Sequence, residues 1–555
     1  MSARWMALAG AWLLVGFALP GSSVAAPADS ARASPAVRGP SIYLRGVLGS
    51  GAPLEGAREA GVVATGGDAA CVSCHQRSGL GSREGKLSIP PVTRDYLFHS
   101  RAQEAGEPVL PYVESLHGNR DPYTEATLAR AIREGLDSEG RPLSYLMPRY
   151  ALGDEDMAAL IGYLKTLSVR RIPGVTDVLL HFATIVTPDA DPLKRRGMLD
   201  VLEQFFAQKN AFPLKPTPRM QTSGKTQYSK SMYMANRHWQ LHVWELTGPA
   251  VGWRAQLDKH LAAEPVYAVL SGIGGSNWAP VHEFCEQNAI PCLFPNVEVP
   301  VIAERDFYPM YFSKGVLLEA ELIARTILGP DQRPIAGAVE QVYRAGDSGE
   351  PAAAALAAQL KEHGVAVHAT VLAAGSQGHR VTAALRKAAR GQALVLWLRS
   401  TDIAALGEVP MGAATVFLSG LMGGLEKSPL PAGWREHTRM IYPFDIPARR
   451  GVRLDYPFGW FSSRHIPVVA EQVQADTFLA CSLLADVLNR MADNFVRPYL
   501  IEQLQSMVEH RLITGYYPHL SLASNQRFAS KGGYVVRFRD PGGTSLVAEG
   551  DWIVP

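Results

Sequence analysis

The strongest constraint on this chain is a short cysteine motif in its N-terminal third. Residues 71–81 read CVSCHQRSGLG, so Cys71 and Cys74 stand three positions apart and His75 follows directly. Two thiols and an imidazole at this spacing can contribute to a structural zinc site, form a redox-active disulfide, or attach a haem covalently. Each of these would make a different kind of protein.

The sequence around the motif favours haem. A structural zinc site needs four ligands, and no second cysteine pair or His-x-x-x-His cluster stands at a usable spacing. A thioredoxin-like disulfide opens a helix after a strand, whereas this motif is flanked by glycine-rich sequence. The spacing is that of covalent haem attachment, in which both thiols bind one porphyrin and the next histidine ligates the iron. We therefore expect one haem c, held by Cys71, Cys74 and His75.

A clear amphipathic helix is expected about 80 residues after the motif. Asp154 is its expected N-cap, with acidic residues in the first turn, where the helix dipole favours negative charge. Its apolar stripe at i, i+3, i+4 and i+7 consists of Met157, Leu160, Ile161 and Leu164. Met157 is therefore expected in the core.

A second iron ligand is expected from the loop before that helix. Met147 stands there, directly before Pro148. A histidine, His99 or His117, is one alternative as distal ligand, and an open coordination position is another. With Met147 in place the iron is coordinatively full, which argues against catalysis at the haem.

With these motifs in place, residues 41–170 resemble a class I cytochrome c. The resemblance implies an all-α domain in which His75 is the proximal ligand, Met147 the distal one, and the Pro90 carbonyl accepts a hydrogen bond from the proximal imidazole. It also implies that the segment PSIYLRGVLGSG forms a short first helix that crosses the last one. The implied activity is one-electron transfer.

The N-terminus has the layout of an export signal. Residues 1–26, MSARWMALAGAWLLVGFALPGSSVAA, combine a short basic start, an apolar stretch and small residues at the end. An uncleaved anchor helix is the alternative, but Gly10, Gly16 and Pro20 interrupt the apolar run. Residues 27–40 are expected to be a disordered leader. No second run of 18 apolar residues follows, so we expect a soluble periplasmic protein with no transmembrane segment after cleavage.

Length and composition predict a multidomain globular protein. The chain has 555 residues, of which 47% are hydrophobic and 19% charged, and a chain of this length exceeds one core. A formal net charge of +2 with no basic patch gives no support for nucleic-acid binding.

Residues 178–555 alternate apolar strands with amphipathic helices, after a linker at 171–177. This alternation predicts parallel sheets covered on both faces. Two groups of such units predict two lobes, with the chain exchanging lobes near 295–311 and 415–445. An α/β two-lobed domain is therefore expected.

This region is similar to type I periplasmic binding proteins, especially the branched-chain amino acid binding group of ABC transporters. The similarity rests on PVYAVLSGIGGSNWAPVHEFCEQNAIPCLFP and on VYRAGDSGE. Residues 212–239 depart from the family pattern. The resemblance implies a small-molecule ligand between the lobes.

Candidate ligand residues follow the strands, because ligands in open α/β sheets bind outside the carboxyl ends of strands. A Gly/Ser loop that opens a helix offers backbone N–H groups to an anion, although such a loop is more often only a turn. The candidates are Ser271, Gly274, Gly275, Ser276, Trp278, Tyr343 and Asp347.

Two cysteines of the second domain stand seven positions apart. In an oxidising compartment a Cys285–Cys292 disulfide is reasonable, and two buried free thiols that face apart are the alternative. Cys481 is expected to be a small core residue.

The sequence contains no nucleophile elbow, phosphate loop or His-Glu-x-x-His motif, so we do not expect an enzyme. The leading hypothesis is an electron carrier whose second domain docks a redox partner, either a dehydrogenase or a membrane electron carrier, or binds a small polar molecule. A ligand receptor, sensor or transport-linked binding protein with an accessory haem is the alternative.

Overall fold

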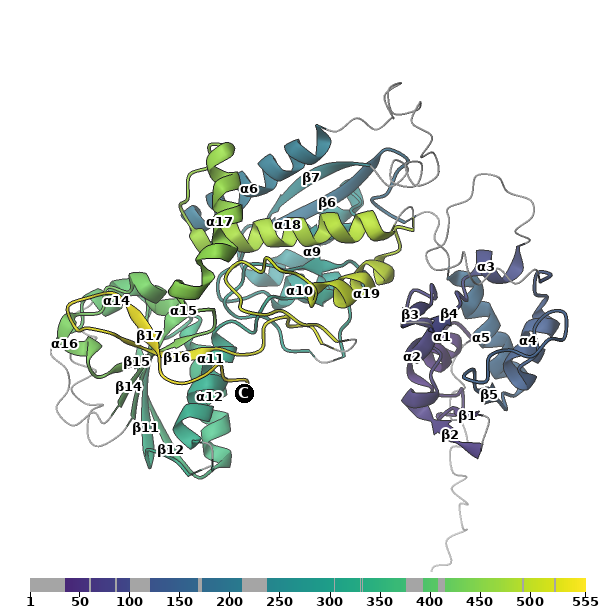
Figure 1. Cartoon of the computed structure of the whole chain (residues 1–555), viewed down its shortest axis with the longest axis horizontal. Coiled ribbons are helices and arrows are strands. Elements are labelled where there is room, and N and C mark those ends of the chain that lie inside the picture. Colours follow the sequence, from purple (N-terminus) through teal and green to yellow (C-terminus); the bar gives the residue numbers. More distant parts are fainter. Residues whose placement is uncertain are drawn as a thin grey trace, which may run out of the picture.

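The structure is a computed structural model in which a small helical domain lies beside a larger, two-lobed α/β domain (Figure 1). It describes residues 35–58, 61–84, 87–99, 120–167, 172–211, 237–303, 305–329, 331, 333–375, 393–407, 415–491, 494–523 and 526–555. The expected export signal, residues 1–26, lies outside these ranges, as do His117 and most of the segment 212–239.

Helices form the core of the first domain, as the sequence predicted, and short strands connect them. The predicted last helix starts one residue earlier than expected, because Gly153 is its N-cap and Asp154 its first residue. The helices are α1 (Pro35–Arg45), α2 (Val72–His75), α3 (Arg94–Phe98), α4 (Glu125–Glu134) and α5 (Asp154–Thr166). The short antiparallel sheets are β2–β1–β5 (Val63–Thr65, Glu55–Ala57, Arg149–Tyr150) and β3–β4 (Ser82–Glu84, Leu87–Ile89).

Helix α1 corrects the predicted boundary of the leader. Residues 35–40 were expected to be disordered, but they form the first turns of α1. The helix packs on α5 so closely that a Cβ atom on Gly39 would lie 2.3 Å from the carbonyl oxygen of Ala159. The Tyr43 and Tyr163 rings meet at 5.2 Å between centroids. Packing against α5 thus outweighs the low helix propensity of the Pro and Gly residues in this segment.

The second domain contains two parallel sheets with the same strand order. The first lobe has the order β7-β6-β8-β9-β10, and the second lobe has β12-β11-β13-β14-β15, extended by the antiparallel strands β16 and β17. The first-lobe strands are β6 (Leu179–Val186), β7 (His238–Glu245), β8 (Ala268–Leu270), β9 (Cys292–Leu293) and β10 (Pro309–Met310). The second-lobe strands are β11 (Ala338–Arg344), β12 (Ala366–Leu372), β13 (Ala393–Trp397), β14 (Thr415–Ser419), β15 (Thr438–Tyr442), β16 (Tyr534–Phe538) and β17 (Leu546–Ala548).

Helices cover both faces of each sheet, so the middle strands β8 and β13 are apolar throughout. In β13, successive residues Val395 and Leu396 belong to apolar clusters on opposite faces, as expected for a buried parallel strand. The longer first-lobe helices are α6 (Pro192–Asn210), α9 (Trp253–Ala263), α10 (Ala279–Gln287), α18 (Glu471–Met491) and α19 (Arg497–Val508). Those of the second lobe and of the crossing between lobes are α11 (Val316–Leu328), α12 (Gly349–Glu362) and α17 (Pro447–Ser463).

The chain passes between the lobes three times, which corrects the predicted crossings. The first crossing follows β10, at the end of the predicted 295–311 interval. The second follows β15, so most of the predicted 415–445 interval belongs to the second lobe. A third crossing leads from α19 to β16 and was not predicted, because its connecting segment 509–533 has no periodic pattern.

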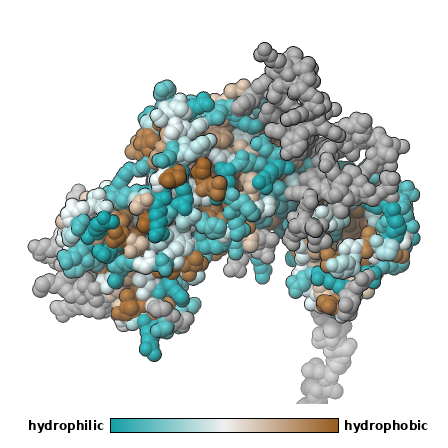
Figure 2. Space-filling view, viewed as in Figure 1, coloured by the Kyte–Doolittle hydropathy of each residue, from teal (hydrophilic) through white to brown (hydrophobic). Residues whose placement is uncertain are grey.

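The surface in Figure 2 is mostly hydrophilic, with apolar side chains scattered or in small groups. No helix within the described part of the chain is long and apolar enough to span a membrane.

Candidate functional site

The cysteine motif forms a single helical turn. The backbone N–H groups of Cys74 and His75 both donate to the Cys71 carbonyl, at 3.2 and 2.9 Å. Both cysteines are half-buried and His75 is buried. The turn therefore presents two thiols and one imidazole from four consecutive positions.

The His75 ring is oriented by a backbone carbonyl. Its Nδ1 lies 2.9 Å from the Pro90 carbonyl oxygen, the contact that the resemblance to class I cytochromes c implied. Burial lowers the pKa of His75 and the Pro90 carbonyl opposes that shift, so the ring is neutral near pH 7. With Nδ1 engaged, Nε2 is the nitrogen left to ligate a metal, and a carbonyl partner of this kind fixes the ring orientation.

The segment that carries Met147 is held next to the cysteine turn. The Tyr150 hydroxyl donates to the Ala69 carbonyl at 2.9 Å, two residues before Cys71. Strand β5 also pairs with β1. Met147 and Cys71 are both half-buried and pack against the same apolar cluster of the first domain. The structure thus brings Cys71 of the motif and the predicted distal residue to one core.

The other candidates for the distal iron ligand are less well placed than Met147. Met157 is buried in the core on α5. The His99 side chain is 53% exposed and lies 3.8 Å from Asp95. His117 lies outside the described residues.

The donor set fits a covalently attached haem better than zinc or a reactive disulfide. In the described ranges no group of three or more His, Cys, Asp or Glu side chains could hold a metal ion. Burial raises the pKa of the Cys71 thiol to about 12, whereas reactive cysteines have lowered pKa values. Cys71 and Cys74 would hold the haem covalently, with His75 and Met147 as iron ligands.

A comparison with protein families decides the nature of this region. Residues 64–168 match the family model Cytochrome c. This region is a cytochrome c domain. The match begins after α1 and β1 and spans the cysteine motif, Pro90, Met147 and α5. No match to the chain was found among curated protein sequences.

Solved structures similar to the chain include binding proteins of ABC transporters. A leucine-binding protein from Thermotoga maritima is 14% identical, covering 68% of this chain and 99% of its own, with a TM-score of 0.47. A branched-chain amino acid ABC transporter protein from Thermus thermophilus with bound valine is 12% identical, covering 69% and 97%, with a TM-score of 0.47. A fatty acid ABC transporter substrate-binding protein from Thermomonospora curvata is 13% identical, covering 70% and 95%, with a TM-score of 0.47.

In the second domain, the predicted anion-binding loop is occupied by a side chain of the protein itself. The N–H groups of Gly275 and Ser276 donate to the Asp189 carboxylate at 3.3 and 3.2 Å. A Cβ atom on Gly275 would lie 2.2 Å from the same carboxylate. Asp189 follows β6 and the loop follows β8, and the strand order reverses between these strands, where ligands of such folds bind. An anionic ligand would have to displace Asp189.

Ser271, Gly274 and Trp278 also face protein groups. The Ser271 hydroxyl is fully buried and lies 3.2 Å from the Thr477 hydroxyl on α18. Trp278 is buried, with its ring against Gly272 and Gly274. These residues build the core behind the loop.

Asp347 takes part in an ion-pair network that joins the lobes. Its carboxylate accepts from Arg399, whose guanidinium also binds both oxygens of Glu298 at 2.8 and 2.6 Å. Lys194 from α6 of the first lobe adds a third cation–carboxylate contact at 3.1 Å. Tyr343, on β11, is half-buried and packs against the apolar layer under α12. The predicted ligand residues of the second lobe are thus not gathered around an open site.

The predicted disulfide is not formed. Cys285 and Cys292 are free, buried thiols. Cys285 is hydrogen-bonded with Cys292, so the alternative in which the thiols face apart is wrong too. Burial in the apolar layer under α10 raises the pKa of Cys285 and keeps it protonated. Cys481 is buried in α18, as predicted.

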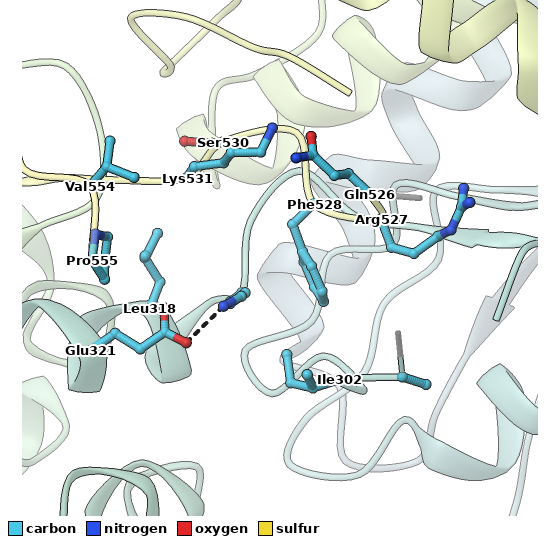
Figure 3. Close-up of a pocket in the computed structure, with 12 residues that line it drawn as sticks. Ile302, Leu318, Glu321, Gln526, Arg527, Phe528, Ser530, Lys531, Val554 and Pro555 are labelled. Carbon is cyan, nitrogen blue, oxygen red and sulfur yellow. Dashed lines mark hydrogen bonds and ion pairs between the residues drawn. The ribbon is translucent and has the colours of Figure 1, made fainter. Parts of the chain in front are cut away.

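A cavity of about 290 Å³ lies at the crossing between the lobes, away from the predicted ligand residues (Figure 3). The segment 526–531, the start of α11 and the C-terminus line it. Lys314 donates to Glu321 at 2.7 Å, and Lys531 donates to the Ser521 carbonyl at 2.7 Å. Both lysines of the lining and Glu321 are thus engaged by the protein.

Sequence reasoning missed Asp189, Glu298 and Arg399. Asp189 and Arg399 follow β6 and β13 directly, at the carboxyl ends of strands beside the reversal of strand order. The rule that pointed to Ser271 and Asp347 would also have found these two. Glu298, by contrast, lies in a loop with no distinguishing pattern.

Proposed function

We propose that this protein is an exported periplasmic electron carrier with a single haem c. The observation that carries the proposal is the cysteine turn, where His75 is buried, neutral and oriented by the Pro90 carbonyl at 2.9 Å. A haem held by two thioethers and a His/Met pair exchanges single electrons and offers no open position to a substrate. We accordingly propose no enzymatic activity.

The first experiment is the intact mass and the reduced-minus-oxidised spectrum of the protein, made in cells with haem-attachment machinery. We expect one covalent haem and a low-spin reduced spectrum. Cys71→Ala/Cys74→Ala should abolish both. Cys481→Ala is the matched control, because it removes a buried thiol outside the motif and should leave the haem in place. A chain without covalent haem would contradict the proposal.

For the second domain, a role in docking the redox partner is favoured over a role as ligand receptor. The supporting observation is that Asp189 already satisfies the amides of Gly275 and Ser276. A thermal-shift series with amino acids, carboxylates and alcohols tests the choice, since a ligand stabilises by RT ln(1 + [L]/Kd). No shift is expected, and a saturable shift with one compound would make the receptor role the better account.

A further inference from the structure

The loop that follows the cysteine motif is buried against the second domain. Ser78 is 3% exposed and Leu80 is 1% exposed, although both lie on the cytochrome c domain. Leu80 belongs to the apolar cluster of the second domain, together with Phe307 and Tyr308. The Arg77 guanidinium lies 4.3 Å from the centroid of the Phe307 ring. Residues 77–80 therefore contact the second domain in three ways: through the Arg77 cation, the polar Ser78 and the apolar Leu80.

The polar contact is made by a buried carboxylate, Glu502 on α19. One oxygen accepts the backbone N–H of Ser78 at 2.8 Å, and the other accepts the Ser78 hydroxyl at 2.6 Å. The Ser78 hydroxyl oxygen in turn accepts the N–H of Leu80 at 3.1 Å. Hydrogen bonds to a charged acceptor are shorter and stronger than neutral ones, so an ionised Glu502 holds Ser78 by two such bonds.

The same loop is bonded to the proximal side of the haem site. The N–H of Gly81 donates to the His75 carbonyl at 3.1 Å, and the N–H of Val92 donates to the Gly79 carbonyl at 2.7 Å. Val92 stands two residues after Pro90, whose carbonyl orients the His75 ring. Residues 76–81 therefore connect Glu502 to both anchors of the imidazole.

The backbone of Gln76, directly after His75, shows that surrounding contacts constrain the conformation of the loop. Its φ of 64° is unusual for a residue other than glycine, and such conformations persist where surrounding contacts enforce them. The Tyr43 hydroxyl donates to its carbonyl at 2.7 Å, and Glu502 holds the next turn of the chain from the other side.

The end of the linker is fastened to the same helix. The Arg497 guanidinium, at the start of α19, donates to the carbonyls of Val266 at 2.6 Å and Tyr267 at 3.0 Å, and reaches the Pro173 carbonyl at 3.4 Å. Helix α19 thus holds the chain where it enters the second domain and also holds the loop next to the haem motif.

We propose that Glu502 is a positioning residue for the haem: it clamps residues 76–81 and thereby lets the second domain set the reduction potential of the cytochrome c domain. The inference rests on the proposed function, since it assigns to the second domain a regulation of the same haem site. In this arrangement the second domain acts on the haem through the proximal loop, without touching the iron.

The test compares full-length haem-loaded variants by redox titration and by hydrogen exchange of the amides of residues 77–81. Glu502→Gln removes the charge and keeps the size, and Glu502→Asp keeps the charge but shortens the reach. Glu509→Gln is the control, because Glu509 is an exposed carboxylate at the end of the same helix. Titration at pH 8 keeps Glu502 ionised, since burial raises its pKa to about 7.

We expect both Glu502 variants to speed exchange of these amides about tenfold or more, as the loss of hydrogen bonds to a charged group implies. We also expect them to change the equilibrium constant for reduction about tenfold, which is about 59 mV for one electron. The Glu509 variant should change neither. A purely electrostatic effect would shift the potential in Glu502→Gln alone, and this result would overturn the clamp.

Unchanged hydrogen exchange in the Glu502 variants would also overturn the clamp, as would faster exchange with an unchanged reduction potential. Should the Glu502 variants fail to fold, Ser78→Ala removes the hydroxyl contact from the other side of the junction, and its failure to speed exchange would overturn the clamp. An unaltered chain without covalent haem would instead contradict the proposed function, so the two failures are distinguishable.

Discussion

The cysteine turn and the loop at 271–276 are both small motifs that the sequence singled out. The binding groups of the turn remain available in the folded protein, whereas those of the loop are already hydrogen-bonded. At the turn, the two thiols remain free and the Nε2 of His75 remains available, because Pro90 engages only the other nitrogen. In the loop, the amides of Gly275 and Ser276 are bonded to Asp189. The donor atoms of the cysteine turn are side-chain atoms that no other part of the described chain has taken up. A motif made of backbone N–H groups binds ligand only if no other part of the chain reaches it first.

The largest expected effect is on the cysteine-turn side of this comparison. Met147→Ala should convert the low-spin spectrum to a high-spin or histidine-rescued one, because the iron would lose its sixth ligand. The measurement is the visible spectrum of the haem-loaded protein in both redox states. Met157→Leu is the control, since this buried residue tolerates a change that conserves its volume. An unaltered spectrum in Met147→Ala, together with a changed one in His99→Ala, would assign the distal position to the histidine.

A smaller effect is expected where side chains of the two lobes neutralise each other. Burial alone would raise the pKa of Glu298, but hydrogen bonds and charge from Arg399, with Lys194 and Ser348, lower it from 4.5 to about 2. A shift of this size corresponds to about 3 kcal/mol of stability. This contribution is fully present above pH 4.5 and is lost as the pH falls through 2.

Glu298→Gln should therefore destabilise the second domain at pH 7 by about 3 kcal/mol and flatten the acid limb of its stability curve. Chemical denaturation at pH 7 and at pH 3 measures both changes. The exposed Glu362 provides the control variant Glu362→Gln. Equal loss of stability in both variants would show that the network between the lobes contributes little.

The smallest effect concerns the loop itself. Asp189→Ala should cost about 1 kcal/mol, because the hydrogen bonds that it breaks are exposed to water. It should also leave two N–H groups free, so that sulfate or formate now raises the melting temperature of the variant and leaves the unaltered protein unchanged. Asp177→Ala, at another exposed aspartate, should show neither change. Anion-dependent stabilisation of the unaltered protein would mean that Asp189 yields readily and that the loop is a binding site after all.

The sequence alone determined the features that depend on neighbours along the chain. The Cys71–Cys74–His75 spacing fits within one helical turn, so its chemistry could be read without a fold. The alternation of apolar strands and amphipathic helices predicted both parallel sheets, because each element carries its own periodicity. The start of α1 was missed, since Gly39 and Pro40 oppose a helix locally and packing on α5 compensates.

Only the tertiary structure decided which groups remain available. Asp189 reaches Gly275 across 86 positions, and Glu502 reaches Ser78 across 424. The place of Asp189 after a strand marks it as a candidate, but no local pattern shows which group it or Glu502 will bond, because these partners meet only when two sheets and three lobe crossings are in place. The hydrogen-bond partner of a buried group depends on which groups the complete fold places within about 3 Å of it. For this reason the haem motif could be identified from eleven residues, whereas the occupied loop and the clamp on the haem domain required the assembled molecule.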